Sequence, residues 1–134
     1  MLDFLRVKTV PTVSWSSLRP RNFFPALRTF VLLCIGLVLF GVGEALLINA
    51  GVGVSPWTVF SQGVANTSGL GIGMSTFFIG VGVLVLWIPL RQTPGLGTLL
   101  NIIIIATVME LSLPYLPQMA GTVSGIIQTM LGVF

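Results

Sequence analysis

Charged side chains are scarce in this sequence. Only 7% of its 134 residues are Asp, Glu, Lys or Arg, while 54% are hydrophobic. In a soluble domain about a quarter of the residues are charged, because its surface stays in contact with water. The composition therefore predicts a protein whose outer surface faces mostly lipid, with the bilayer itself as its main partner.

Histidine is absent, and the single cysteine, Cys34, lies in an apolar run. These absences exclude a histidine metal site, a histidine proton relay, an internal disulfide and a thiolate metal cluster. Serines such as Ser61 and Ser75 have no histidine to activate them for covalent catalysis. We expect no enzymatic activity, no catalytic residues, no cofactor and no metal site.

Positive charge is concentrated near the N-terminus. Every basic residue except Arg91 precedes the first long apolar run, at Arg6, Lys8, Arg19, Arg21 and Arg28. A basic segment beside a membrane span is typical of the cytoplasmic side, whereas a nucleic-acid-binding domain carries its basic groups on a folded surface. Residues 1–28 are therefore interpreted as a basic cytoplasmic tail, and no nucleic-acid partner is expected.

Residues 29–134 are dominated by long apolar runs and predict an all-α, polytopic transmembrane domain. Full spans are expected at about 29–50, 71–90 and 96–113, followed by a shorter fourth run at 119–134 that ends without a charged stop. That ending indicates a truncated or partial chain. Arg91 follows the second span, so the positive-inside rule places it and the N-terminus together on the cytoplasmic side of the cell membrane.

A break at Gly51–Trp57 separates the first two spans. Ser55 followed by Pro56 is a favourable N-cap and first-turn pair, and it predicts a short helix over about 55–66. A helix of this length cannot cross a core that needs about 20 residues. It must lie on the interface, with Trp57 as its anchor, or enter the membrane and return.

Glu44 and Glu110 are the main candidates for ion or substrate coupling, together with Ser55 and Trp57. A carboxylate inside a span costs about 2.5–3.5 kcal/mol on insertion scales, so it seldom faces lipid. The predicted topology puts both acids at similar depth in the outer half of the membrane. Protonation, a shared proton or cation, and a donor from the helix at Ser55 all remain open. The alternative is that each acid is merely solvated near the headgroups.

Glycine stripes are the candidates for helix packing. Gly36 and Gly43, Gly73 and Gly80, and Gly125 and Gly132 are each seven residues apart, and Gly121 and Gly125 form a small-xxx-small pair. Such spacing lines one face of a helix and lets two backbones approach closely. These positions are Gly36, Gly43, Gly73, Gly80, Gly121 and Gly125.

The segments GVGVSPWTVFSQG at 51–63, TSGLGIG at 67–73 and RQTPGLGTLLN at 91–101 resemble the YczE family of bacterial integral membrane proteins, which is related to the YitT group. Position 58 is Thr, where the family pattern often has Asp. The resemblance implies a bacterial cytoplasmic membrane protein. Family members are longer, with a second half that weakly repeats the first.

Two function hypotheses follow. In the first, the protein is a small-solute transporter or half of one, in which Glu44 and Glu110 couple to a proton or cation, and a homodimer completes the half. In the second, it is a non-transporting membrane partner that assists the assembly or export of another complex through its glycine faces.

Overall fold

The computed structural model describes residues 23–116 and 122–133, and within these ranges the chain forms five α-helices and no strand. This confirms the all-α class. The tail predicted at 1–28 lies outside the described residues up to position 22. The helices are α1 (Leu27–Ala50), α2 (Pro56–Ser68), α3 (Ile72–Trp87), α4 (Leu96–Ser112) and α5 (Thr122–Val133).

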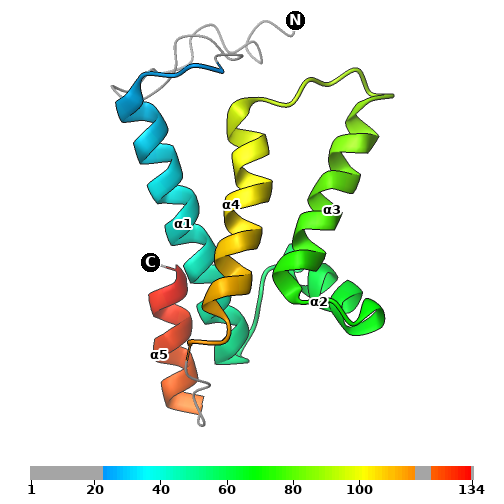
Figure 1. Ribbon diagram of the computed structural model, residues 1–134. Coiled ribbons are helices and arrows are strands. Elements are labelled where there is room, and N and C mark those ends of the chain that lie inside the picture. Colours follow the sequence, from blue (N-terminus) through cyan, green and yellow to red (C-terminus); the bar gives the residue numbers. More distant parts are fainter. Residues whose placement is uncertain (1–22, 117–121, 134) are drawn as a thin grey trace, which may run out of the picture.

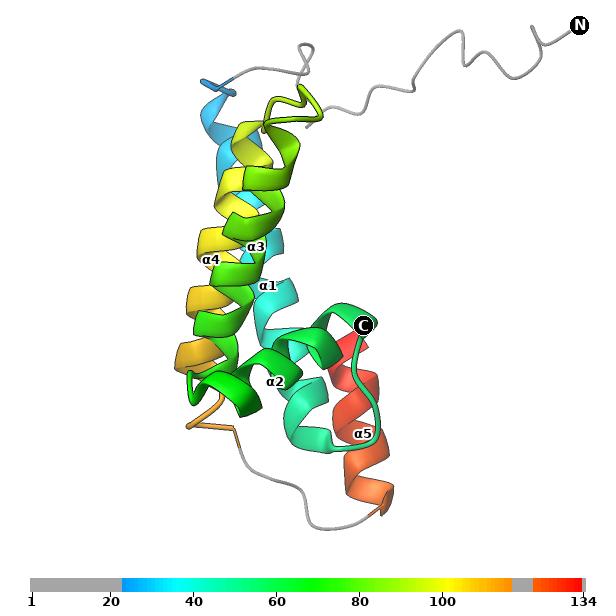
Figure 2. The same cartoon turned by 90° about the vertical axis from the view of Figure 1, so that its right-hand side faces the viewer.

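The helices form an up-and-down bundle with one transverse element. In Figure 1, α1 and α4 descend, α3 and α5 rise, and α2 lies across the lower end, as the side view in Figure 2 also shows. α1 packs against α4 and α5, α4 also packs against α3, and α2 packs against α3. The Asn49 amide ties the lower ends of α1 and α4 together by donating to the Leu116 carbonyl oxygen at 3.0 Å. The bundle is therefore held at the same end at which α2 lies.

Glycines end the two helices at the lower turns. Gly51 follows α1 with φ +65°, and Gly69 follows α2 with φ +74°. This left-handed conformation is disfavoured for residues with a Cβ. It ends a helix because the glycine N–H bonds back to a carbonyl oxygen of the last turn. After Gly69 the chain turns directly into α3, and the axes of α2 and α3 make an angle of 110°.

The described helices differ in whether they are long enough to cross a membrane. α1 has 24 residues and, of the described helices, is the one long and apolar enough to span by itself. At 1.5 Å per residue it is about 36 Å long. Its most apolar stretch is only 17% buried, unlike the core helix of a soluble protein. The bent pair α2–α3 passes the same test if it is counted as one span.

The distribution of side chains on α2 is the reverse of that in a soluble protein. Thr58 and Ser61 are 2% and 0% exposed, whereas Trp57 and Phe60 are 46% and 57% exposed. The two pairs lie on neighbouring faces of α2, the structure turns the hydroxyl face inward, and Trp57, at the border between the faces, is half-exposed. The hydroxyl side chains of Thr58 and Ser61 are therefore packed inside the bundle.

The glycine stripes serve contacts inside the bundle. A Cβ built on Gly43 would lie 2.5 Å from the carbonyl oxygen of Gly132 on α5, and one built on Gly80 would lie 2.9 Å from Ile102 on α4. Gly73 lies equally close to the α4 backbone, and Gly125 approaches the Ala50 carbonyl oxygen. Gly36 has no neighbour within 4 Å. Gly121 lies outside the described residues.

The Gly43 contact yields a test of this packing. We expect Gly43→Ala to force α1 and α5 apart and to destabilise the protein by about 1–3 kcal/mol, as overpacking does. Gly36→Ala is the matched control on the same helix and should leave the thermal midpoint unchanged. The measurement is thermal unfolding of the purified protein in detergent, followed by circular dichroism. Equal midpoints for the two variants would contradict the close approach of α1 and α5.

Candidate functional site

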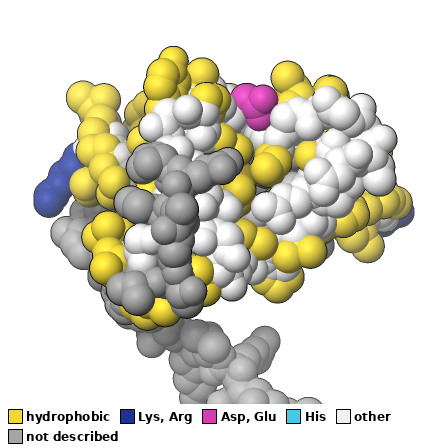
Figure 3. Space-filling view, turned by 90° about the horizontal axis from the view of Figure 1, so that it is seen from below, with side chains coloured by type: hydrophobic (Ala, Val, Ile, Leu, Met, Phe, Trp, Pro, Cys, Tyr) yellow, Lys and Arg dark blue, Asp and Glu magenta, His cyan; other side chains and the backbone are white. Residues whose placement is uncertain are grey.

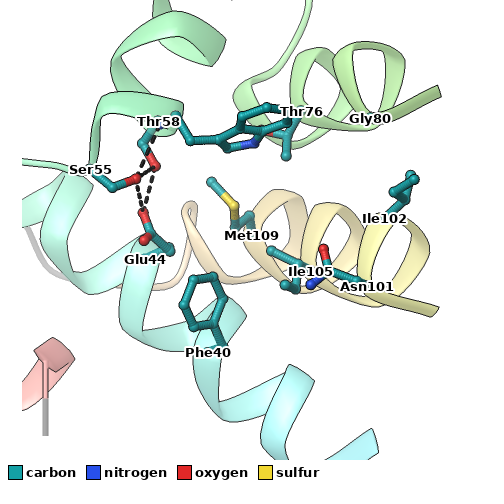
Figure 4. A pocket seen from close by; sticks show the side chains of 11 residues that line it. Phe40, Glu44, Ser55, Thr58, Thr76, Gly80, Asn101, Ile102, Ile105 and Met109 are labelled. Atoms are coloured by element: carbon teal, nitrogen blue, oxygen red, sulfur yellow. Dashed lines mark hydrogen bonds between the residues drawn. The ribbon is translucent and has the colours of Figure 1, made fainter. Parts of the chain in front are cut away.

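Glu44 is a buried carboxylate near the lower end of α1, only 8% exposed. The Gly51 turn brings the start of α2 back beneath it. Thr58 donates a hydrogen bond from Oγ1 to Glu44 Oε2 at 2.5 Å, and Ser55 Oγ lies 3.5 Å from the same oxygen (Figure 4). Three residues from two helices thus form one polar cluster.

Ser55 has a second role as the N-cap of α2. Its Oγ accepts a hydrogen bond from the Thr58 backbone N–H at 3.2 Å, and Pro56 occupies the first turn. The predicted N-cap and first-turn pair is confirmed. Ser55 Oγ is also 2.8 Å from Thr58 Oγ1. The Thr58 hydroxyl has one hydrogen, and it is donated to Glu44. In the contact between the two hydroxyls, Ser55 is therefore the donor and Thr58 the acceptor.

The electrostatic environment of Glu44 comes from backbone and hydroxyl dipoles. The N-terminus of a helix carries about half a positive charge, and at α2 that charge lies beside the Glu44 carboxylate. Within the described ranges the basic residues are Arg28 and Arg91. Arg28 precedes Glu44 by 16 positions on α1, which is about 24 Å of helix. Arg91 follows α3, at the upper end of Figure 1. Neither is positioned to neutralise Glu44.

A cavity of about 330 Å³ opens beside this cluster. Figure 4 shows Phe40 below the Glu44 carboxylate. Met109, which belongs to α4, faces Glu44 from the other side of the cavity. The remaining lining is apolar or uncharged, and Glu44 is its one ionisable group. The lining residues are Phe40, Glu44, Ser55, Trp57, Thr58, Thr76, Gly80, Asn101, Ile102, Ile105 and Met109.

Glu110 on α4 binds a different helix. Its Oε2 accepts hydrogen bonds from the backbone N–H groups of Gly73 at 2.8 Å and Met74 at 3.2 Å, in the first turn of α3. A side chain at Gly71, the N-cap of α3, would collide with this carboxylate. Glu110 is exposed, and an acidic group reaches the surface in the view from below (Figure 3). Glu110 therefore caps α3.

The two acids bind different partners in the structure. Glu44 accepts hydrogen bonds at the start of α2, and Glu110 accepts them at the start of α3. Glu110 also lines a separate cavity of about 380 Å³ with Gly73, Met74 and Phe77. Ser55 and Trp57, by contrast, do lie with Glu44.

Residues 27–134 match a family of unknown function, DUF6198. The chain belongs to this family. It is also 34% identical, over 128 residues, to an uncharacterised protein of Haemophilus influenzae. That alignment covers 96% of this chain and 58% of the relative, so the chain spans under two thirds of the relative's length. No solved structure matches.

Most of the cavity lining was not predicted from the sequence of this DUF6198 chain, and Thr58, Phe40 and Met109 show why. Thr58 donates to Glu44 from another helix, and no local pattern predicts that contact. Phe40 precedes Glu44 by four residues, and that spacing alone places both on one face of α1. Met109 carried no signal, because its contact with the cavity depends on how α4 packs. Among the described residues, no group of three or more His, Cys, Asp or Glu side chains gathers to hold a metal.

The cap at α3 can be tested by amide exchange. Glu110→Ala removes the acceptor for two N–H groups, and an unsatisfied group costs about 1–3 kcal/mol where it is buried. We expect the Gly73 and Met74 amides to exchange faster in this variant. Glu110→Gln keeps a side-chain oxygen and should retain much of the protection. Unchanged exchange in Glu110→Ala would show that this carboxylate does not hold α3.

Proposed function

We propose that the protein crosses the bacterial cytoplasmic membrane several times and carries a small solute across it, with Glu44 as the coupling carboxylate. The observation that carries the proposal is the site of Glu44: a carboxylate 8% exposed, held by hydroxyls and a helix N-terminus, in an otherwise uncharged cavity. An ionisable group inside a membrane bundle marks an ion or substrate path more often than a structural contact.

The side-chain distribution supports the membrane setting. Large apolar side chains such as Leu39, Phe78 and Leu86 are more than half exposed, while polar Ser61, Ser75 and Thr76 are buried. Such a surface is stable against lipid, where apolar groups need no burial. The short helices α4 and α5 and the bent α2–α3 pair then complete a polytopic bundle around α1. The resemblance to the YczE family, whose members are bacterial membrane proteins, agrees with this setting.

Charge supports a cytoplasmic N-terminus. Arg28 lies in the first turn of α1, and Arg91 lies in the connection between α3 and α4, at the same upper end of the bundle (Figure 1). Both then satisfy the positive-inside rule with one orientation. The turn between α2 and α3 faces the opposite side.

This topology predicts the labelling of introduced cysteines. In a Cys34→Ala background, Thr93→Cys should react with an impermeant maleimide only after the membrane is opened. Asn66→Cys, near the end of α2, should react in intact cells, because both positions are exposed and lie at opposite ends of the bundle. Labelling of both positions from the same side would overturn the proposed crossing of α3.

The mechanism proposed is alternating access around the α2–α3 break. Glu44 carries its charge while a cation or proton donor is bound and must lose that charge or regain a partner before the cavity closes, because an isolated carboxylate is costly in a dry interior. Because Thr58 and Ser55 donate hydrogen bonds to Glu44, a change in the charge of Glu44 alters the contact between α1 and the start of α2. The glycine caps at Gly51 and Gly69 give α2 two points about which to move. Glu110 holds α3 in place during the cycle.

The packing of the glycines weighs against the rival function as an accessory partner. Gly43, Gly73, Gly80 and Gly125 each contact another helix of the same chain. These four positions are therefore not free to contact a second protein, and of the described stripe glycines Gly36 is left open. The Haemophilus influenzae relative is longer than this chain, so transport is to be measured on the full-length product of the gene.

Substitution of Glu44 tests the proposal. In liposomes that contain the complete protein and a trapped pH dye, we expect solute-driven proton movement to disappear in Glu44→Gln and to persist in Glu110→Gln. Dicyclohexylcarbodiimide, which attacks protonated carboxyls in apolar surroundings, should modify Glu44 and spare the exposed Glu110, as read by peptide mass spectrometry. Unchanged flux with both acids replaced by Gln would sink the coupling role.

A further inference from the structure

The Glu44 cavity also carries information on the chemistry of its ligand, and this inference rests on the transport function proposed above. We infer that the transported solute is a small organic cation, an amine or quaternary ammonium with an apolar body, bound between the Glu44 carboxylate and the rings of Phe40 and Trp57.

The sign of the ligand charge follows from what already occupies the helix N-terminus. A free helix N-terminus favours an anion. At α2 that position holds the Glu44 carboxylate through Thr58 and Ser55, so a second anion would meet a like charge in a region of low dielectric. Both hydroxyls contact Oε2, so Oε1 retains its lone pairs for a further donor. The cavity therefore favours a cation.

The rings decide in favour of an organic cation over a metal ion. Phe40 from α1 and Trp57 from α2 line the same cavity as Glu44, together with the Met109 thioether. Aromatic faces attract ammonium groups, and aromatic cages are a recurring means of binding quaternary ammonium ligands. A hard divalent ion instead needs six or more oxygen ligands, which this lining does not bring together.

Cavity size and polarity limit the rest of the molecule. A volume of about 330 Å³ lies near the lower end of the range of about 300–1,000 Å³ for small-molecule sites. Ile102 and Ile105 offer apolar contact to the body of the ligand. Thr76 and Asn101, uncharged, lie on the far side of the cavity and suit a neutral polar group.

A pair of isosteric probes tests the charge requirement. Choline and 3,3-dimethylbutan-1-ol have nearly the same shape, but the second replaces the charged nitrogen by carbon. Binding of each to the complete protein in detergent is measured by isothermal titration calorimetry. We expect choline to bind saturably and the neutral alcohol to bind at least about tenfold more weakly. Equal affinities, or no binding of choline or tetramethylammonium, would overturn the inference.

Two variants with matched controls locate the site. Glu44→Gln should weaken choline at least about tenfold while leaving the neutral alcohol unchanged, and Glu110→Gln should behave as the wild type. Trp57→Leu should weaken choline by about 2- to 30-fold, the range of cation–π contacts, and Phe60→Leu on the exposed face of the same helix should not. Choline affinity unaffected by Glu44→Gln would place the cation elsewhere and overturn the inference.

The outcome separates this inference from the transport function. If no cation binds at Glu44 but carbodiimide still modifies it and solute-driven proton movement still requires it, Glu44 carries a proton only. The organic-cation inference then fails while the transport proposal stands. If the carboxyl is unmodified and proton movement is independent of it, the transport proposal fails on its own measurement.

Discussion

The structure depends on how two carboxylates are satisfied inside a bundle with very few charges. Each acid is held at the N-terminus of one half of a broken helix pair: Glu44 through the hydroxyls of Ser55 and Thr58 at α2, and Glu110 through the backbone N–H groups of Gly73 and Met74 at α3. A helix N-terminus offers unpaired donors and positive partial charge, which a carboxylate matches. The acids thereby join α1 to α2 and α4 to α3, and they set where the break between the two halves lies.

The same arrangement gives the two acids different capacities. Glu110 is exposed, and its Oε2 accepts hydrogen bonds from two backbone N–H groups of α3. Glu44 receives hydroxyl donors on one oxygen and lies in a cavity with two aromatic rings. Hydroxyl groups rotate and exchange donor for acceptor, whereas a backbone N–H always donates. A carboxylate held by hydroxyls can therefore change its charge or partner with less cost to the surrounding structure, which is why function is proposed for Glu44.

Close helix packing supplies the rigidity around this cluster. Gly43 contacts Gly132 across α1 and α5, and Gly80 receives Ile102 from α4. Backbones that approach this closely gain dispersion contacts, which contribute to the association of the helices. These contacts lie immediately beside the cavity: Gly80 lines it, and Gly43 is adjacent to Glu44. α2 lies beside these contacts and is bounded by Gly51 and Gly69, both with positive φ.

By itself the sequence determined the all-helical class, the positions of the helices to within a few residues, the Ser55 and Pro56 start of α2 and the presence of two acids, Glu44 and Glu110, within apolar runs. These features follow from local rules: apolar run length, cap chemistry and the cost of a charge among apolar residues. Only the tertiary structure decided that the two acids bind different helices, that the hydroxyl face of α2 turns inward and that Phe40 and Met109 share a cavity with Glu44. Those outcomes depend on the 110° bend between α2 and α3 and on which helix α4 packs against. Both depend on contacts between residues far apart in the sequence, which local hydropathy and capping patterns do not predict.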